Sequence, residues 1–502
     1  MDMFSGLASG FELALTPQAL MFAFIGVLIG TVIGVLPGIG PITTIALLIP
    51  LSFGMEPVHG LILLSAIYYG SMYGGSITAT LIRTPGEVAS VVTAIDGYEM
   101  ARRGRAGPAL ATAAIGSFLA GTLAVVALML LSPVLVKLAV FLGAQEYFLL
   151  MLLALMMAST LTTGSRLKAV LATLLGLAVG VIGLDPQSGT PRETFGVLEL
   201  QDGIDFAIFA MALFAVPEAI NNLCRRGKGE VPMEVQGTPW MSREDWRRSR
   251  GPWGRGAVLG FLIGVLPGVG PSLAAFMSYV MEKRISKRKD EFGKGAIEGV
   301  AGPEAANNAG VGGSMVPLLS LGIPGSATTA LLLFVFMMYG LQPGPLLFES
   351  DPGLVWAIIA SMYVGNAMLL VLNLPLVGVF VKLLAIPTPL LFSGVLAFVV
   401  LGAYALGFSL FSMLLLLVFG VIGFFMEEVG IPLAPAVLAL VLEPLLETNL
   451  RRALQISGGD LMSFVQRPAS LVLVIVCVVV VLLPLVTKLL ARRDRSPVSA
   501  SV

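Results

Sequence analysis

The chain has 502 residues, of which 57% are hydrophobic and only 12% are charged, and its mean hydropathy is +0.94. Soluble globular domains carry about twice that share of charged residues, so this composition excludes a soluble domain and predicts an integral membrane protein. Two cysteines, one histidine and a formal net charge of zero exclude zinc, haem and iron–sulfur sites. We therefore expect no cofactor and no nucleic-acid partner.

Apolar stretches of about 20 residues, the length that crosses about 30 Å of hydrocarbon, recur along most of the chain and leave room for about ten or more crossings. The first residues, MDMFSGLASGFELALTPQAL, contain no basic region and no small-residue cleavage site, so a cleaved signal peptide is not expected. Together these features predict an all-α polytopic membrane protein in contact with the lipid bilayer.

Two motifs occur twice along the chain. Residues 34–41 read GVLPGIGP and residues 264–271 read GVLPGVGP. Residues 73–86 read YGGSITATLIRTPG, and residues 311–325 read VGGSMVPLLSLGIPG. The offset is 230 residues for the first pair and 238 to 239 for the second, so the repeating unit spans about half of the chain.

This repetition gives a domain prediction. We expect a first repeat at 15–222, a cytoplasmic linker at 223–255, a second repeat at 256–490 and a cytoplasmic tail at 491–502.

Loop charges predict how the two repeats are oriented, because Lys and Arg favour cytoplasmic loops. Between its two motifs the second half carries EKRISKRKDEFGK, whereas the matching loop of the first half is PLSFGMEPVHG. After the second motif the pattern reverses: the first half has Arg102, Arg103 and Arg105, and the second half has GLQPGPLLFESDPG. The repeats are therefore predicted to have inverted topology, with a periplasmic amino terminus and a cytoplasmic carboxyl terminus.

Four arginines do not follow this charge rule. Arg192, Arg451, Arg452 and Arg467 fall on the predicted outer side. The rule is statistical and their loops also contain acidic residues, so we keep the topology and treat the four as exceptions.

The Pro-Gly motifs predict broken helices at membrane depth. Lipid offers no hydrogen-bond partner to the backbone N–H and C=O groups that a helix break exposes. Such breaks are therefore tolerated only when they are buried in protein or line a water-filled cavity. The residues of the first motif pair are Pro37, Gly38, Gly40 and Pro41, and Pro267, Gly268, Gly270 and Pro271. Helix amino termini at breaks suit an anionic group, and the nearby hydroxyls of Thr43, Thr44 and Ser272 add ligands. The alternative is that these small residues only allow close helix packing.

The second motif pair has small residues followed by a break, which predicts a helix that turns back within the membrane as a re-entrant hairpin. Its candidate residues are Gly74, Gly75, Ser76, Thr78, Thr80, Pro85 and Gly86 in the first half, and Gly312, Gly313, Ser314, Ser320, Pro324, Gly325 and Ser326 in the second.

Polar residues in apolar surroundings extend the candidate site. Glu304, Asn307 and Asn308 lie in GPEAANNAG; amides bind a carboxylate without a permanent charge, and their carbonyls can coordinate a cation. Hydrogen bonding between helices is the alternative for the asparagines. A sodium site near Gly38, Gly268 and Asn307 is possible.

Arg83 precedes Thr84-Pro85-Gly86. It suits a bidentate pair with a substrate carboxylate, but equally it can extend to the membrane surface or pair with Glu87 or Asp96.

Known catalytic motifs are missing from the sequence. It contains no GxxxxGK[ST] phosphate loop, no GxSxG turn and no HExxH helix. We expect the protein not to be an enzyme, and its energy source to be an ion gradient or a partner. A membrane scaffold and an integral membrane enzyme without a recognised motif are the alternative functions.

The Pro-Gly-x-Gly-Pro segments, the GGS segments leading to TPGE and IPGS, and the PEAANNA stretch together resemble the large membrane subunit of the tripartite tricarboxylate transporter family, over about residues 15–485. The resemblance implies secondary active import of di- or tricarboxylates such as citrate, or of aromatic acids, across the bacterial inner membrane. It also implies a small membrane subunit and a periplasmic solute-binding protein as partners, with Na⁺ or H⁺ as the coupling ion.

The same family is similar in plan to elevator-type transporters, in which a domain with paired hairpins carries the substrate across the membrane. By that resemblance, residues 30–100 and 260–330 form the mobile part and the remaining helices form the scaffold.

Overall fold

The computed structural model describes residues 3–36, 38–161, 164–224, 240–384 and 386–493, without the side chains of residues 483–493. Nearly every element in these ranges is a helix; the one sheet is the short antiparallel pair of β1 (Gly183–Leu184) and β2 (Pro191–Arg192). The protein is therefore an all-α polytopic membrane protein, as predicted. Pro37, the part of the predicted linker at 225–239 and the tail at 494–502 lie outside the described residues.

Seven described helical segments are long and apolar enough to cross a membrane, and three shorter apolar helices accompany them. The seven are Pro17–Val35, Ala106–Ala139, Ala144–Leu161, Phe206–Cys224, Pro352–Asn373, Thr388–Gly407 and Leu410–Glu428. Long apolar helices alone therefore account for fewer than the ten crossings expected. Several other helices are long enough to cross a membrane but carry more polar residues, among them α4 (Pro57–Leu81) and α13 (Glu298–Leu321).

Helices are interrupted at both copies of the first motif. In the first half α2 (Pro17–Val35) ends at the second residue of the motif and α3 (Pro41–Ser52) begins at its last. In the second half α11 (Arg243–Gly264) ends at the first residue of the motif and α12 (Gly270–Ile285) begins at its seventh. Gly38, Gly268 and Gly270 have φ values of +90°, +77° and +73°, a backbone conformation that favours glycine. Residues 243–255 of the predicted linker are part of α11.

The second motif also interrupts a helix in each half. α4 (Pro57–Leu81) is followed, after the break, by the 3₁₀ turn η1 (Val88–Val91) and α5 (Thr93–Arg102). α13 (Glu298–Leu321) is followed by α14 (Ala327–Met338). Both long helices are buried over nearly their whole length. The second-half break at 322–326 is buried as well, whereas the first-half break is exposed at Arg83 and Thr84 and buried again from Gly86.

Glycines bring the paired helices of each half into close contact. α2 packs along α4, and α11 packs along α13. A Cβ atom on Gly34 would lie 2.4 Å from the Ser71 carbonyl oxygen, and one on Gly264 would lie 2.4 Å from the Gly310 carbonyl oxygen. In both helix pairs the two backbones are therefore in direct contact, which small residues allow between membrane helices.

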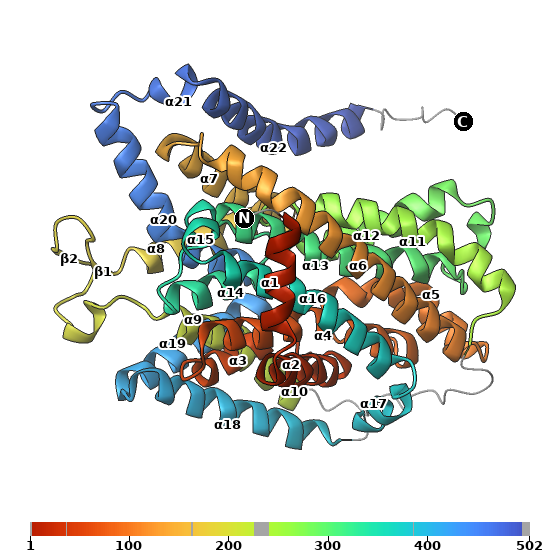
Figure 1. The fold of residues 1–502 in the computed structure, drawn as a ribbon. Helices are drawn as coiled ribbons and strands as arrows, with labels where there is room; N and C mark the ends of the chain where they lie inside the picture. Colours follow the sequence, from red (N-terminus) through yellow and green to blue (C-terminus); the bar gives the residue numbers. More distant parts are fainter. Residues whose placement is uncertain (1–2, 37, 162–163, 225–239, 385, 494–502) are drawn as a thin grey trace, which may run out of the picture.

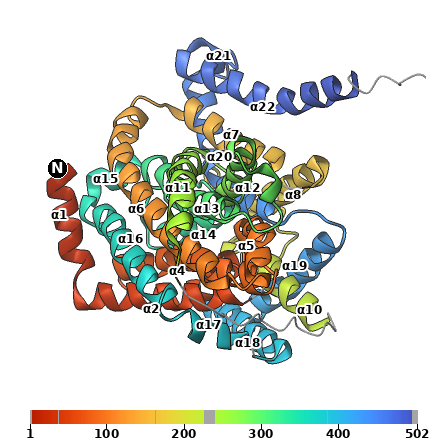
Figure 2. The ribbon, with the colours of Figure 1, turned by 90° about the vertical axis from the view of Figure 1, so that its right-hand side faces the viewer.

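The remaining helices surround these two pairs (Figures 1 and 2). They are α1 (Met3–Ala14), α6 (Ala106–Ala139), α7 (Ala144–Leu161), α8 (Arg166–Gly180), η2 (Leu198–Leu200), α9 (Phe206–Ala210), η3 (Met211–Ala215), α10 (Val216–Cys224), η4 (Lys289–Glu291), α15 (Pro345–Ser350), α16 (Pro352–Asn373), α17 (Val377–Leu383), α18 (Thr388–Gly407), α19 (Leu410–Glu428), α20 (Ala434–Ile456), α21 (Ser463–Gln466) and α22 (Pro468–Arg493).

The long helices α6 and α16 each pack against the opposite half of the chain. α6 packs against α11 and α13, whereas α16 packs against α2 and α4. α21 and α22 lie at the upper edge of the molecule in Figure 1, with α22 against α7.

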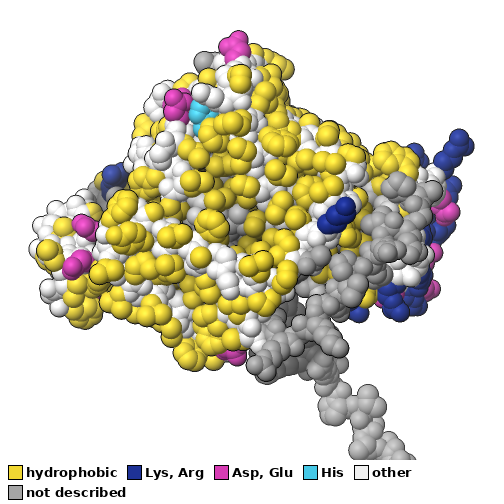
Figure 3. Space-filling view, turned by 90° about the horizontal axis from the view of Figure 1, so that it is seen from below, with side chains coloured by type: hydrophobic (Ala, Val, Ile, Leu, Met, Phe, Trp, Pro, Cys, Tyr) yellow, Lys and Arg dark blue, Asp and Glu magenta, His cyan; other side chains and the backbone are white. Residues whose placement is uncertain are grey.

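Loops from the two halves meet at both ends of the molecule. At one end, Asp96 on α5 accepts hydrogen bonds from the backbone N–H groups of Gly293 and Gly295, both at 2.8 Å. At the other, the Tyr339 hydroxyl donates to the Ser52 carbonyl at 2.5 Å. The first end lies to the right in Figure 3, where Lys and Arg side chains gather beside a broad hydrophobic surface. The loops that were predicted to share a side of the membrane are thus neighbours.

Three of the four arginines that break the charge rule are paired with acidic side chains. Arg192 and Arg451 both contact Asp185 and Glu447, which joins the β1–β2 hairpin to α20. Arg467 contacts Glu146 at 3.1 Å. Each of these three arginines is therefore held by an acidic side chain, and the side of the membrane on which they lie stays a prediction.

Substituting Gly264 tests the helix contact. We expect Gly264→Ala to lower the free energy of unfolding by about 1–3 kcal/mol, because the added methyl group meets backbone that has little room to move. Gly254→Ala is the matched control on the same helix, since nothing lies within 4 Å of a Cβ there. Thermal unfolding of the purified variants compares them; equal midpoints would contradict the close contact.

Asp185 gives a prediction for the hairpin. The hydrogen bond from Arg451 holds the pKa of the Asp185 carboxyl well below its usual range. The hairpin contact is therefore expected at neutral and mildly acidic pH and is lost only as the pH falls through that lowered pKa. Asp185→Asn should speed amide hydrogen exchange at 183–192 at neutral pH, whereas exposed Asp202→Asn should not; unchanged exchange in the Asp185 variant would count against this anchoring.

Candidate functional site

A buried carboxylate lies between the two halves at the level of the second motif. Glu304 on α13 is completely buried. One of its oxygens accepts a hydrogen bond from Ser76 on α4 at 2.5 Å, and the other accepts one from Thr93 at the start of α5. Both donors belong to the first half, so this site forms only where the halves meet.

A second carboxylate lies next to the first. Glu87 follows the Thr84-Pro85-Gly86 break, and its side chain is buried. It accepts hydrogen bonds from Ser90 and from the Asn307 amide nitrogen, each at 3.3 Å. The Asn307 carbonyl oxygen is buried and has no hydrogen-bond partner among the described residues.

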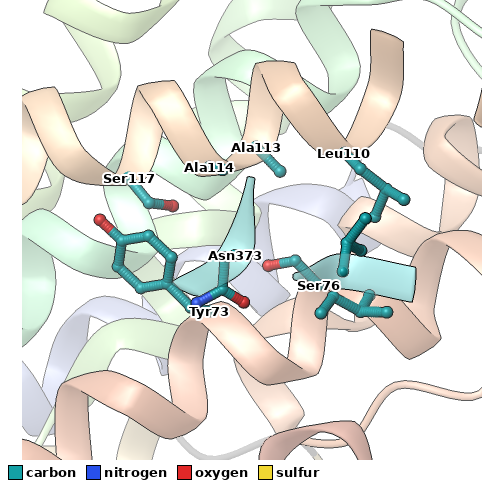
Figure 4. Close-up of a pocket in the computed structure, with 9 residues that line it drawn as sticks. Tyr73, Ser76, Leu110, Ala113, Ala114, Ser117 and Asn373 are labelled. Carbon is teal, nitrogen blue, oxygen red and sulfur yellow. The ribbon is translucent and has the colours of Figure 1, made fainter. Parts of the chain in front are cut away.

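Asn308 extends this polar cluster toward a recess. Its amide nitrogen donates to the Ser117 hydroxyl on α6 at 2.6 Å, which is the interhelical role considered as the alternative for the asparagines. Ser117 and Ser76 both line a small recess with room for about one water molecule. Figure 4 shows Ser76, Tyr73 and Asn373 around the same space, below Ser117 on α6. The other lining residues are Ile77, Leu110, Ala113, Ala114 and Val377.

The two breaks of each half lie against one another. In the first half, a Cβ on Gly86 would come within 1.7 Å of the Gly34 carbonyl oxygen at the end of α2 and 3.2 Å of the Thr78 hydroxyl. In the second half, the Gly270 N–H at the start of α12 donates to the Gly325 carbonyl at 3.1 Å. Pro85 and Pro324 immediately precede the two glycines.

A smaller hydroxyl cluster lies at the second-half break. The Tyr68 hydroxyl on α4 is 3.4 Å from the Ser314 hydroxyl and 3.2 Å from the Ser326 hydroxyl. Gly313, beside Ser314, packs on α11. Tyr68 thus joins the first half to the second motif of the other half.

The first-motif glycines have separate neighbours. Gly38 lies against Glu218 on α10, and Gly268 lies against Ala154 on α7. Gly40 has open space around it. No contact joins Gly38, Gly268 and Asn307 among the described residues, so the structure does not bring these three together.

The remaining predicted residues lie around these breaks. Thr43 is buried and Ser272 is half-buried. Gly75 packs against Glu87 and Ser90. Arg83 is exposed with a φ of +55°, and its guanidinium lies 5.7 Å from the centre of the Tyr98 ring; the described structure shows no ion pair with Glu87 or Asp96.

Sequence reasoning missed Thr93, Ser90 and Ser117, and it treated Glu87 only as a partner of Arg83. Glu87 carried a usable signal, because a carboxylate directly after a Pro-Gly break in an apolar region is costly unless it has a function. Thr93 and Ser117 carried none, because their partners lie more than 190 residues away in the chain.

The sequence matches the description "Tripartite tricarboxylate transporter TctA family" over residues 20–438. The chain belongs to this family. As a TctA-family protein it is a component of a tripartite tricarboxylate transporter, and the resemblance carried by the repeated motifs is confirmed.

Two relatives from Agrobacterium vitis extend the comparison. The "Uncharacterized 52.8 kDa protein in TAR-I ttuC' 3'region" is 49% identical over 498 residues, which cover 99% of both chains. The "Uncharacterized protein in TAR-II ttuC' 3'region" is 49% identical over 239 residues, which cover 47% of this chain and 98% of that relative. No solved structure matches this TctA-family chain.

Asp96 gives a prediction for the contact between the halves. Three backbone N–H groups donate to one of its oxygens, those of Gly293, Gly295 and Ala296, and the Tyr279 hydroxyl donates to the other. Since hydrogen bonds to a charged group contribute about 1.5–3 kcal/mol each, Asp96→Asn should lower the free energy of unfolding by at least about 1.5 kcal/mol. Tyr279→Phe should have a smaller effect.

Thermal unfolding of the purified protein measures this effect. Asp290→Asn is the control, because Asp290 is exposed on the same loop. A stability of Asp96→Asn equal to that of the control would show that the contact does not hold the halves together.

Proposed function

We propose that this protein is the large membrane subunit of a secondary active importer of di- or tricarboxylates, citrate or a related organic acid, in the bacterial inner membrane. The observation that carries the proposal is the polar cluster around Ser76, Asn307 and Asn308, which lies between two matched sets of broken helices. Membership of the TctA family supplies the substrate class. A passive scaffold has no need of paired breaks around such a cluster.

Inverted repeats are supported by matched packing. The pair α2 and α4 corresponds in sequence to α11 and α13, and α16 contacts the first pair as α6 contacts the second. In the same way α10 packs on α18 and α19, while α20 packs on α7 and α8. Tyr68 on α4 lies beside Ser314 on α13, and Ser76 further along α4 donates to Glu304 nearer the start of α13, so these two matched helices run in opposite directions.

We propose that the recess beside Ser76 widens to admit the substrate, which neutral groups then bind. Hydroxyl and amide groups donate to a carboxylate without leaving a buried charge when the substrate departs. The polar side chains lining the recess are Ser76, Ser117, Tyr73 and Asn373. The hydroxyl protons of Ser76 and Tyr73 are donated to Glu304 and Asn366 here, so they would turn to the substrate when it binds. The glycines of the four breaks and the hydroxyls of Thr43, Thr78, Ser272 and Ser314 are proposed as the rest of the pathway, because broken backbone at membrane depth exposes N–H and C=O groups.

An elevator-like movement of residues 30–100 and 260–330 is the proposed transport step, with the remaining helices as the scaffold. The close glycine contacts within each half and the Asp96 contacts between them support movement of these segments as one unit.

Partners and energy source follow from the same assignment. A small membrane subunit and a periplasmic solute-binding protein complete the proposed system, and a Na⁺ or H⁺ gradient drives it. The binding protein delivers the carboxylate to the outer side, where the amino terminus is also proposed to lie.

Asn373→Asp tests the recess. The added carboxylate would repel an anionic substrate in a buried space, where like charges cost several kcal/mol; we expect at least about tenfold lower uptake of the carboxylate, at normal abundance of folded protein. The assay uses the purified complex with its partner subunits in proteoliposomes, under imposed sodium and proton gradients and with a panel of di- and tricarboxylates.

Asn449→Asp is the control, because both asparagines donate from the amide nitrogen to the carbonyl four residues earlier, at 3.0 Å for Asn373 and 2.7 Å for Asn449. Unchanged uptake by Asn373→Asp would show that the substrate pathway does not pass through this recess. Failure of the intact complex to import any carboxylate under either gradient would favour the scaffold or enzyme alternatives.

A further inference from the structure

Two buried carboxylates from opposite halves lie in this cluster without a cationic partner. Glu304 has no exposed surface and Glu87 is 8% exposed. Among the described residues, no Lys, Arg or His nitrogen lies within 4.0 Å of either carboxylate, although thirteen other ion pairs are formed. Burying two ionised carboxylates without a cationic partner costs much free energy, so a positive charge or a proton must compensate them.

The two carboxylates are neighbours. Glu304 and Asn307 are three residues apart on α13, and Asn307 donates to Glu87. Residues three apart on a helix are on the same face, with roughly 5–6 Å between their Cβ atoms. On the facing side Thr93 donates to Glu304 and Ser90 donates to Glu87, again three residues apart. Asn307 and the segment 90–93 therefore both connect the surroundings of the two carboxylates.

Asn307 supplies a second, independent indication of a ligand. Its amide nitrogen donates to Glu87, but its amide oxygen is fully buried and has no donor. A buried acceptor of this kind is rarely left unpaired. A cation coordinated by carboxylate and amide oxygens would satisfy it, and so would a proton on the Glu87 carboxyl.

No other ionisable side chain on the packed elements supplies this positive charge. Tyr68 and Tyr73 on α4 are neutral phenols. Asp96 on α5 is occupied by four hydrogen bonds, and Glu282 on α12 pairs with Arg255 at 2.6 Å.

We infer that Glu87, Glu304 and the Asn307 amide oxygen bind one monovalent cation, a proton or Na⁺, that crosses the membrane together with the substrate. The inference rests on the proposed function and names the residues that hold the coupling ion.

The geometry also explains why ion and substrate would move together. Ser76 donates to Glu304 and at the same time lines the recess. An anionic substrate in the recess is therefore one side chain away from a buried carboxylate, and the two repel each other at low dielectric constant. A cation at Glu87 and Glu304 removes this repulsion, so each ligand strengthens the binding of the other.

The test uses Glu87→Gln and Glu304→Gln, which keep the size of each side chain and remove its charge. The complete complex in proteoliposomes is given a sodium gradient at equal pH, or a proton gradient without sodium. Wild type should accumulate the carboxylate under one of these gradients, and the arm that drives it identifies the ion. In both variants this accumulation should be at least about tenfold lower than in wild type. Glu87→Gln should still exchange labelled for unlabelled carboxylate across the membrane, because the glutamine amide resembles the neutralised carboxylate.

Glu443→Gln is the matched control, a buried carboxylate on α20 that lies outside this cluster. Should a glutamine variant not fold, Asn307→Ala gives a second test: the ion concentration for half-maximal uptake should rise several-fold. Gradient-driven accumulation that survives in both glutamine variants, with an unchanged ion dependence in Asn307→Ala, overturns the inference while leaving carboxylate import intact. A wild-type complex that imports nothing overturns the proposed function itself.

Discussion

Backbone N–H and C=O groups that leave a helix inside a membrane find no water there, so they must lie against other protein. In the described part of the chain, helices are interrupted at all four copies of the two motifs, and the two interruptions of each half lie against one another. Gly86 lies so close to the Gly34 carbonyl that only a residue without a side chain fits, and Gly270 donates directly to Gly325. The arrangement of α2, α4, α11 and α13 depends on these contacts.

The polar cluster is a product of both halves. Glu304 comes from the second half, and both of its hydroxyl partners come from the first; Glu87 comes from the first half, and its amide partner Asn307 comes from the second. Charged and polar groups at membrane depth are costly unless they are paired and functional. Their concentration at this one junction, beside a recess, is what distinguishes it from the glycine contacts elsewhere, which only allow close packing.

Much of the fold was predictable, because its signals are local. Pro and Gly mark where α3, α12 and α14 begin, and apolar length marks the membrane helices. Lys and Arg in the loops predicted which loops share a side, and those loops are in contact. Ser76, Asn307 and Asn308 were recognisable because each is a polar residue in an apolar helix.

Pairing between distant segments was not predictable in the same way. Thr93 and Ser117 look like ordinary helix residues until their partners on α13 are known. For Arg83 the sequence left open a substrate contact, a place at the membrane surface or a pair with Glu87 or Asp96; its side chain is exposed and lies beside the Tyr98 ring. The pairs of Arg451 with Asp185 and of Arg467 with Glu146 were equally unpredictable, because the two members of each pair lie far apart in the sequence.

The contacts of Asp96 and Glu304 also constrain how the protein is made. A ribosome that has synthesised the first half has placed Asp96, Ser76 and Thr93 in or near the membrane, but the groups that satisfy them lie at residues 293–304. Until those residues have been made, Asp96 and Thr93 lack the partners that they have in the folded protein, whereas Ser76 can still donate to the Met72 carbonyl of its own helix. The first half therefore reaches its final packing only after α13 has been synthesised.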